Sequence, residues 1–196
     1  MKKIKIGLTG GMGSGKSLVA NILSTIGIPI YDSDTEAKRL TIEDVLIRKE
    51  LTNLLGKDLF FNDSIDKKKL ATYLFASAAN AQRINSIIHP CVKKDFKSWA
   101  ELQPTKYVAI ESAILIEAGF VVDVDYVVLV YAPKELRIER TMKRDRVSKE
   151  TVESRFSRQL DDEKKKEHAD FIIVNDGVTP LIPQIYKLLE DLSLKE

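Results

Sequence analysis

Residues 10–17 of this 196-residue chain read Gly-Gly-Met-Gly-Ser-Gly-Lys-Ser and match the pattern G-x-x-x-x-G-K-[ST]. The apolar, β-branched run Ile4–Thr9 precedes them, and an amphipathic helical pattern that includes Val19 and Leu23 follows. A strand before the loop and a helix after it are the context that this pattern requires. A glycine-rich turn with a chance Gly-Lys-Ser would lack that context. The feature therefore constrains the chain to a fold with a strand, a phosphate-binding loop (P-loop) and a helix in direct succession.

The chemistry of the loop follows from its residue types. Glycines permit backbone torsions that turn successive amides toward one point, and the start of the helix adds the positive end of its dipole. Lys16 can reach the β- and γ-phosphates, and the Ser17 hydroxyl can ligate Mg²⁺. We predict that the loop binds a nucleoside triphosphate through Gly11, Met12, Gly13, Ser14, Gly15, Lys16 and Ser17.

Short apolar runs separated by helical patterns indicate the fold class. Runs of this length suit strands that are buried on both faces of a parallel sheet. Their alternation with helices favours βαβ units with right-handed crossovers. The prediction is an α/β protein of the P-loop NTPase fold, a five-stranded parallel sheet flanked by helices, with strands at Ile4–Thr9, Ile28–Tyr31, Tyr107–Ile110, Tyr126–Tyr131 and Phe171–Val174.

The segment between the second and third predicted strands is too long for one crossover helix and reads as several helices. Apolar stripes at helical spacing include Ile84 in one pattern and Phe96 in another. Pro90 falls between these patterns, and the residue before a proline is biased away from helical geometry. We expect a helix boundary at His89-Pro90 and a helical insertion large enough to bind a ligand.

The composition of the chain indicates its cellular compartment and the classes of partner that it can bind. Lys plus Arg (31) nearly balances Asp plus Glu (29), and the net charge of +2 does not point to nucleic acid or to a membrane surface. The single cysteine, Cys91, excludes an intrachain disulfide and fits a reducing compartment. No apolar run is long enough for a secretory signal or a membrane helix. We expect a cytoplasmic protein with no nucleic-acid or membrane partner.

Two carboxylates follow the second predicted strand. Asp32 and Asp34 lie in the stretch Tyr-Asp-Ser-Asp-Thr, at the carboxyl end of a strand, where ligands bind in open α/β sheets. Asp34 is also a suitable N-cap for the next helix. Capping and catalysis therefore both remain open for this pair. The guanine-specific element Asn-Lys-x-Asp does not occur in the chain, which disfavours a GTPase switch.

In order and spacing, several stretches resemble the dephospho-coenzyme A kinase family across nearly the whole chain. They are GLTGGMGSGKSLVA, YDSDTEAK, SIIHPCV, ILIEAG, RTMKRD and ADFIIVNDG. The resemblance implies that ATP, with Mg²⁺, phosphorylates the ribose 3′-hydroxyl of dephospho-coenzyme A, the last step of coenzyme A synthesis. It also implies a core at about 1–34, 105–139 and 168–196, an acceptor-binding insertion at about 35–104 and a lid at about 140–167.

The same resemblance implies roles for residues at the reacting centre. Asp34 would orient or deprotonate the 3′-hydroxyl, while Lys16 and Arg140 would stabilise charge on the phosphoryl group in transfer. Asp32 would hold Mg²⁺ through water, beside the hydroxyl of Ser17.

Further residues would bind the substrates. His89 would contact the acceptor, Arg144 would belong with Arg140 to the lid that closes over ATP, and Asn175 and Gly177 would flank the adenine. His89 could instead cap a helix or satisfy a buried polar group. Asn175-Asp176-Gly177 is also an ordinary turn signal.

One departure from the family concerns the stretch after the third predicted strand. Ala113 stands where the family usually has proline, and Glu111 stands at a place the family fills variably. The position of Glu111 at a strand end permits metal binding, but the resemblance does not assign it. The remaining alternatives are another small-molecule or nucleotide kinase and a nucleotide-dependent binding switch. We expect a monomer and leave weak self-association open.

Overall fold

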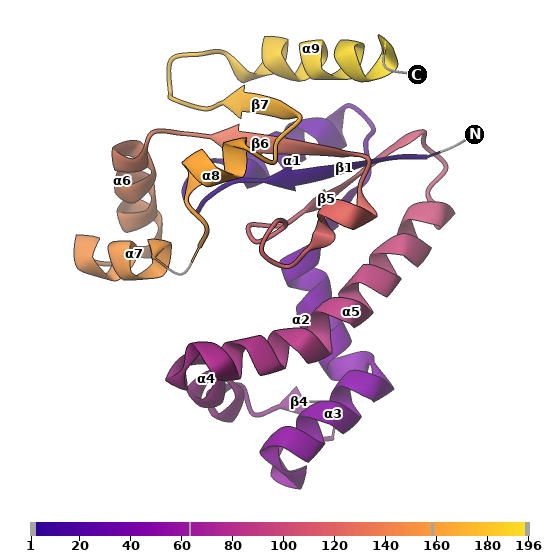
Figure 1. Cartoon of the computed structure of the whole chain (residues 1–196), viewed down its shortest axis with the longest axis vertical. Helices are drawn as coiled ribbons and strands as arrows, with labels where there is room; N and C mark the ends of the chain where they lie inside the picture. The colour runs from indigo at the N-terminus through magenta and orange to yellow at the C-terminus, as the bar shows by residue number, and fades with distance from the viewer. Residues whose placement is uncertain (1–2, 63, 158, 195–196) are drawn as a thin grey trace. The chain divides into compact units, whose positions relative to one another are not determined.

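The computed structural model describes residues 3–62, 64–157 and 159–194. The chain forms two compact units. The first combines residues 1–31 with residues 100–196, and the second comprises residues 32–99 (Figure 1). The second unit occupies the stretch in which the sequence predicts an insertion over about 35–104.

The first unit is built on a five-stranded sheet in the order β2-β5-β1-β6-β7. β1 runs parallel to both β5 and β6, and β6 runs parallel to β7. In the register, Ile4 lies opposite Tyr107, and Ile6 lies opposite Tyr126 on the other side. The strands are β1 (Ile4–Thr9), β2 (Ile30–Asp32), β5 (Tyr107–Glu111), β6 (Tyr126–Tyr131) and β7 (Phe171–Val174).

The predicted strands are confirmed, with a shift at β2 and an extension of β5 by one residue, to Glu111. The sequence places this strand at Ile28–Tyr31, whereas the structure has it at Ile30–Asp32. Pro29 has no amide proton, so it cannot donate to the ladder, although its carbonyl accepts from Ala109 at 2.9 Å. The shift makes Asp32 the last residue of the strand.

Helices cover the sheet of the first unit. The apolar faces of α1 and α9 share one core with the sheet, in which Val19 and Leu23 are fully buried and Leu188 is nearly so. α8 packs against β6. The helical elements are α1 (Lys16–Thr25), the 3₁₀ turn η2 (Phe120–Asp123), α6 (Lys134–Asp145), α7 (Lys149–Phe156), α8 (Asp162–Lys166) and α9 (Leu181–Leu194).

The second unit is mainly helical, and the side chains of Ile47, Leu51 and Phe96 in it are fully buried. A short antiparallel hairpin pairs β3 with β4. Its elements are α2 (Ser33–Glu43), α3 (Val45–Leu55), the 3₁₀ turn η1 (Lys57–Leu59), β3 (Phe60–Phe61), β4 (Ser64–Ile65) and α4 (Lys67–Ala76), and α5 (Ala78–Leu102) runs from this unit into the first.

The helix boundary expected at His89-Pro90 is wrong. α5 continues through Pro90 as one 25-residue helix. A proline inside a helix costs about 3 kcal/mol because it removes a hydrogen bond and crowds the preceding turn. Burial of Ile84 before the proline and of Val92 and Phe96 after it offsets that cost, since all three side chains are at most 2% exposed.

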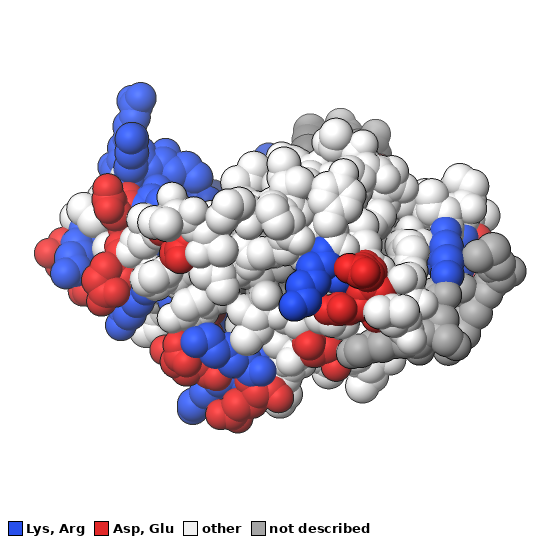
Figure 2. Space-filling model, turned by 90° about the horizontal axis from the view of Figure 1, so that it is seen from above, with Lys and Arg blue, Asp and Glu red and all other residues white. Residues whose placement is uncertain are grey.

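Charged side chains of both signs are interspersed on the face shown in Figure 2, in keeping with the near balance of 31 basic and 29 acidic residues. Within the described residues, no helix has both the length and the apolar character that a membrane crossing demands.

Candidate functional site in the glycine-rich loop

The glycine-rich loop between β1 and α1 has the backbone that its sequence predicts. Gly13 and Gly15 have φ values of 80° and 90°, in the left-handed region that side chains disfavour. A methyl group at Gly13 would lie 2.4 Å from the carbonyl oxygen of Arg137, and one at Gly15 would lie 2.0 Å from Nδ2 of Asn175. Both positions therefore require glycine, because a side chain would be disfavoured by the backbone torsion and would clash with a neighbouring atom.

The loop ends directly in α1. Gly15 is the N-cap, and its carbonyl accepts from the amides of Leu18 and Val19 at 3.0 and 3.2 Å. Amides in the first turn of a helix have no acceptor within the helix, so they are available to an anion. The first turn of α1 contains no acidic residue of its own.

Lys16 and Ser17 converge on a carboxylate that the sequence analysis left unassigned. Oε1 of Glu111, the last residue of β5, accepts from Nζ of Lys16 at 2.8 Å and from Oγ of Ser17 at 2.7 Å. The side chains of Lys16 and Glu111 are 14% and 12% exposed. The parallel pairing of β1 and β5, which sets Leu8 opposite Glu111, brings this strand end beside the loop. The only sequence signal for Glu111 was its place at a strand end.

Asn175 and Arg140 support the loop from the side of β7. Nδ2 of Asn175 donates to the carbonyl of Ser14 at 2.8 Å, in a buried contact. Nη1 of Arg140 donates to the carbonyl of Asn175 at 3.0 Å. Gly177 has a φ of 88°, and a methyl group there would lie 3.8 Å from Nη2 of Arg140. The structure thus brings three of the predicted ATP-binding residues together around the loop.

The arginines at helical spacing in α6 have separate partners. Arg144 pairs with Asp145, with Nε 2.7 Å from Oδ1. Arg137, in contrast, is buried and forms an ion pair with Asp162, with Nη1 3.2 Å from Oδ2. Although Arg137, Arg140 and Arg144 recur at helical spacing, their side chains therefore lie in three different environments. The spacing alone could not show this, because the partners of Arg137 and Arg140 come from distant parts of the chain.

The Arg137–Asp162 pair lies against the first half of the loop. A methyl group at Gly11 would be 1.8 Å from Nη1 of Arg137 and 2.7 Å from Oδ1 of Asp162. The guanidinium also stacks on Phe156, 4.8 Å from the ring centroid. Burial raises the pKa of the Asp162 carboxyl, and the positive charges of Arg137 and Lys165 partly oppose this effect.

The aspartate pair and His89 belong to the second unit. Asp32, not Asp34, is the N-cap of α2: its Oδ1 accepts from the amides of Asp34 and Thr35 at 3.0 and 3.2 Å. The suggestion of Asp34 as the cap is therefore wrong, because α2 begins at Ser33, directly after the strand. Asp34 lies in the first turn of α2, where a carboxylate favours the helix dipole.

His89 lies inside α5 rather than at a helix end. Its side chain is half-buried, and burial lowers its pKa, with a smaller contribution from the ammonium group of Lys93. The roles of His89, Asp32 and Asp34 toward a ligand stay predictions.

Comparison with known proteins shows a consistent likeness. A family model described as dephospho-CoA kinase matches residues 4–180. A dephospho-CoA kinase of Bacteroides fragilis is 50% identical over 193 residues, which cover 98% of this chain and 94% of that protein. The crystal structure of TT1252 from Thermus thermophilus superposes with a TM-score of 0.83 at 28% identity, covering 100% of this chain and 98% of that one. The dephospho-CoA kinase of Campylobacter jejuni has the same fold, with a TM-score of 0.70 at 24% identity, covering 100% and 99%.

Proposed function

Because the chain belongs to the dephospho-CoA kinase family, we propose that it transfers the γ-phosphoryl group of ATP to the ribose 3′-hydroxyl of dephospho-CoA. The observation that carries the proposal is the family match over residues 4–180, which includes the complete glycine-rich loop. The products are coenzyme A and ADP, and the bond between the γ-phosphorus and the bridging oxygen of ATP is the one that breaks.

The loop would bind the triphosphate. The amides at the start of α1, which have no acceptor within the helix, would donate to the phosphate oxygens. Lys16 would exchange its contact with Glu111 for the β- and γ-phosphates, as the lysine of this motif does. Arg140, which already touches the neighbouring turn at Asn175, would add positive charge at the site. Phosphoryl transfer depends chiefly on such positioning and charge neutralisation.

We further propose Mg²⁺ as the metal. The hydroxyl of Ser17 and the carboxylate of Glu111, 2.7 Å apart, are the oxygen ligands that Mg²⁺ prefers. Across the described residues there is no group of three or more His, Cys, Asp or Glu that could hold a metal. When Mg²⁺ is bound with a nucleotide, it usually keeps several waters and completes its shell with phosphate oxygens. Bound there, the metal would neutralise charge on the β- and γ-oxygens. Asp32, whose carboxylate caps α2, stays a predicted outer ligand.

Asp34 would manage the acceptor proton. The 3′-hydroxyl oxygen attacks the γ-phosphorus, and its proton passes to the Asp34 carboxylate as the new bond forms. Arg144 would join the lid arginines, His89 would contact the acceptor, and Gly177 would flank the adenine. The cytoplasmic location and the monomeric state also stay predictions.

An acceptor screen tests the function. ADP release is measured with dephospho-CoA, with adenosine monophosphate and with no acceptor. Release with dephospho-CoA alone supports the proposal. Release with adenosine monophosphate would indicate a different nucleotide kinase, and slow release without acceptor would indicate a nucleotide-dependent switch. The Asp34→Asn variant should bind ATP normally and lose most of its turnover; a near-normal kcat would refute the role of Asp34.

A further inference from the structure

A side chain outside the glycine-rich motif accepts a hydrogen bond from one of the backbone amides of the loop. Oε1 of Gln159 accepts a hydrogen bond from the amide of Met12 at 3.0 Å. Gln159 lies in the segment between α7 and α8, far from the loop in sequence. We propose that Gln159 is a positioning residue, which holds the Gly11–Met12 turn in its binding shape before nucleotide arrives. The inference deepens the proposed function and rests on it for the catalytic readout only.

The segment that carries Gln159 is itself anchored. The amide of Leu160 donates to Oε1 of Glu117 at 2.9 Å. The same oxygen lies 3.2 Å from Nζ of Lys165, a fully buried lysine that also donates to the carbonyl of Ala113 at 2.6 Å. Three contacts therefore tie residues 160–165 to the loop that follows β5. Gln159 is thus held by the framework of the first unit, so it can restrain the glycine-rich loop.

The neighbouring residue of the turn is held from a second direction. The guanidinium of Arg137, fixed by Asp162, covers the Cα of Gly11 so closely that no side chain fits there. Gly11 and Met12 are consecutive, so one contact restrains each residue of the turn. Their supports come from different elements, α6 and the segment before α8. Together they restrict a stretch that glycines would otherwise leave free.

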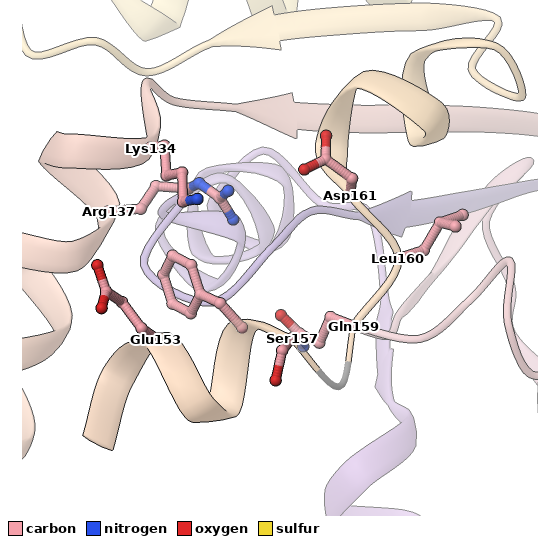
Figure 3. A pocket seen from close by; sticks show the side chains of 8 residues that line it. Lys134, Arg137, Glu153, Ser157, Gln159, Leu160 and Asp161 are labelled. Atoms are coloured by element: carbon pink, nitrogen blue, oxygen red, sulfur yellow. The ribbon is translucent and has the colours of Figure 1, made fainter. Parts of the chain in front are cut away.

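A cavity of about 250 Å³ separates these supports. Figure 3 shows Arg137 entering it from α6, with Gln159 and Ser157 on the opposite wall. Because the cavity borders Gln159, a side chain of similar size can replace it without overpacking. Ser157 lines the same cavity, but its hydroxyl donates to the carbonyl of Ser154 in its own helix turn, at 3.0 Å. Ser157 therefore provides a matched control.

A restrained loop loses less conformational freedom on binding, which strengthens affinity without a new contact to the ligand. The Gln159→Met variant removes the acceptor and keeps the length of the side chain. One neutral hydrogen bond is worth about 0.5–1.5 kcal/mol, which corresponds to a rise of about 2-fold to 13-fold in the Kd for ADP. Once phosphate orders the loop, kcat and the KM for dephospho-CoA should stay near their original values.

The experiment compares Gln159→Met, Gln159→Glu and Ser157→Ala in the full chain. ADP affinity is measured by calorimetry, and exchange of the Met12 amide by NMR or mass spectrometry. We expect faster Met12 exchange and a higher Kd in Gln159→Met. Gln159→Glu, which keeps an acceptor oxygen, should retain slow Met12 exchange. Ser157→Ala should match the original protein in both measurements.

Unchanged Met12 exchange and an unchanged Kd in Gln159→Met would overturn the inference, as would equal effects in Ser157→Ala. A fall in kcat without a change in Kd would also contradict it, because the restraint acts on the free loop. The binding and exchange measurements need no acceptor. If the original protein failed to phosphorylate dephospho-CoA, the proposed function would fall while these two results still decided the role of Gln159.

Discussion

Oε1 of Glu111 accepts a hydrogen bond from Nζ of Lys16 at 2.8 Å, and both side chains are largely shielded from solvent. The carboxylate thus accepts from the Lys16 ammonium group, the donor that a phosphate group would need. Nucleotide binding must replace this ion pair, and a cation introduced with the phosphates would give the carboxylate a new partner. We therefore predict that the pair links nucleotide affinity to Mg²⁺.

The first prediction concerns this link. In Glu111→Gln, ADP should bind about 3-fold to 10-fold more tightly without Mg²⁺, because a negative charge beside the phosphates is removed and Lys16 is released. Addition of Mg²⁺ should raise the ADP affinity of the variant much less than it raises that of the original protein. Calorimetric titrations of ADP with Mg²⁺ and with a chelator measure both effects.

Glu101→Gln serves as the control for this prediction. It removes the same charge from an exposed side chain, which forms an ion pair with Lys5 at 3.7 Å. Its ADP affinity and Mg²⁺ dependence should not change. If Mg²⁺ raised the ADP affinity of Glu111→Gln and of the original protein by the same factor, Glu111 would be excluded from the metal site.

The second prediction concerns the buried pair of Arg137 and Asp162. Removal of one partner leaves an uncompensated buried charge, so Arg137→Met should lower the free energy of unfolding by about 3–5 kcal/mol. Adding Asp162→Leu removes the stranded carboxylate, so the double variant should recover most of that loss. Urea unfolding of both single variants and the double variant measures the coupling. Additive losses would show that the two side chains contribute independently.

The third prediction separates torsional strain from close packing. Gly13 and Gly27 both have positive φ values, 80° and 93°. A methyl group at Gly27 meets nothing within 4 Å, whereas one at Gly13 meets the backbone of Arg137 at 2.4 Å. Gly27→Ala should cost about 1–2 kcal/mol of unfolding free energy, the price of left-handed torsion alone. Gly13→Ala should cost clearly more and should abolish ADP binding. Equal losses of stability would contradict the packing at Gly13.

Much of the fold was predictable because the signals are local. Continuous apolar runs define the strands, and Gly-x-x-x-x-Gly-Lys-Ser specifies the loop that follows the first of them. Pro90 shows the limit of such signals. Its local preference is to end a helix, but burial of Val92 and Phe96 on the same face outweighs that preference.

The contacts that shape the loop were less predictable, because they join residues far apart in the chain. Glu111 reaches Lys16 only through the register of two parallel strands. Gln159 carries no motif that indicates a contact with Met12. Asn175 was predicted as an adenine neighbour, and the structure adds a contact with Ser14 that a turn signal does not imply.

The fourth prediction tests what Asn175 does. Asn175→Asp replaces the donated hydrogen bond with a carboxylate facing the Ser14 carbonyl, at a buried site. The loss should be about 1–3 kcal/mol in the free energy of unfolding. If Asn175 acts through the loop, ADP and GDP should lose affinity by the same factor. A loss confined to ADP would instead support a direct contact with adenine. Calorimetry with both nucleotides, beside urea unfolding, distinguishes the two roles.

The fifth prediction concerns pH. Burial lowers the pKa of His89 in the folded protein, whereas a histidine in an unfolded chain has a pKa of about 6.5. Below that pH the unfolded chain binds a proton that the folded chain resists, so the free energy of unfolding falls as the pH falls. His89→Gln should reduce this dependence between pH 7.5 and about 5, because its side chain does not titrate. His168→Gln, which alters an exposed histidine, is the control.

Asp162 makes the comparison between variants necessary. Its pKa is raised in the folded protein, so as the pH falls the folded chain takes up a proton at Asp162 before the unfolded chain does. The free energy of unfolding therefore rises as the pH falls through this range. This contribution is opposite in sign to that of His89 and is the same in the original protein and in His89→Gln. The difference between their urea-unfolding curves therefore isolates the histidine. A difference that stays constant from pH 7.5 to 5 would show that His89 takes up its proton equally in the folded and unfolded chain.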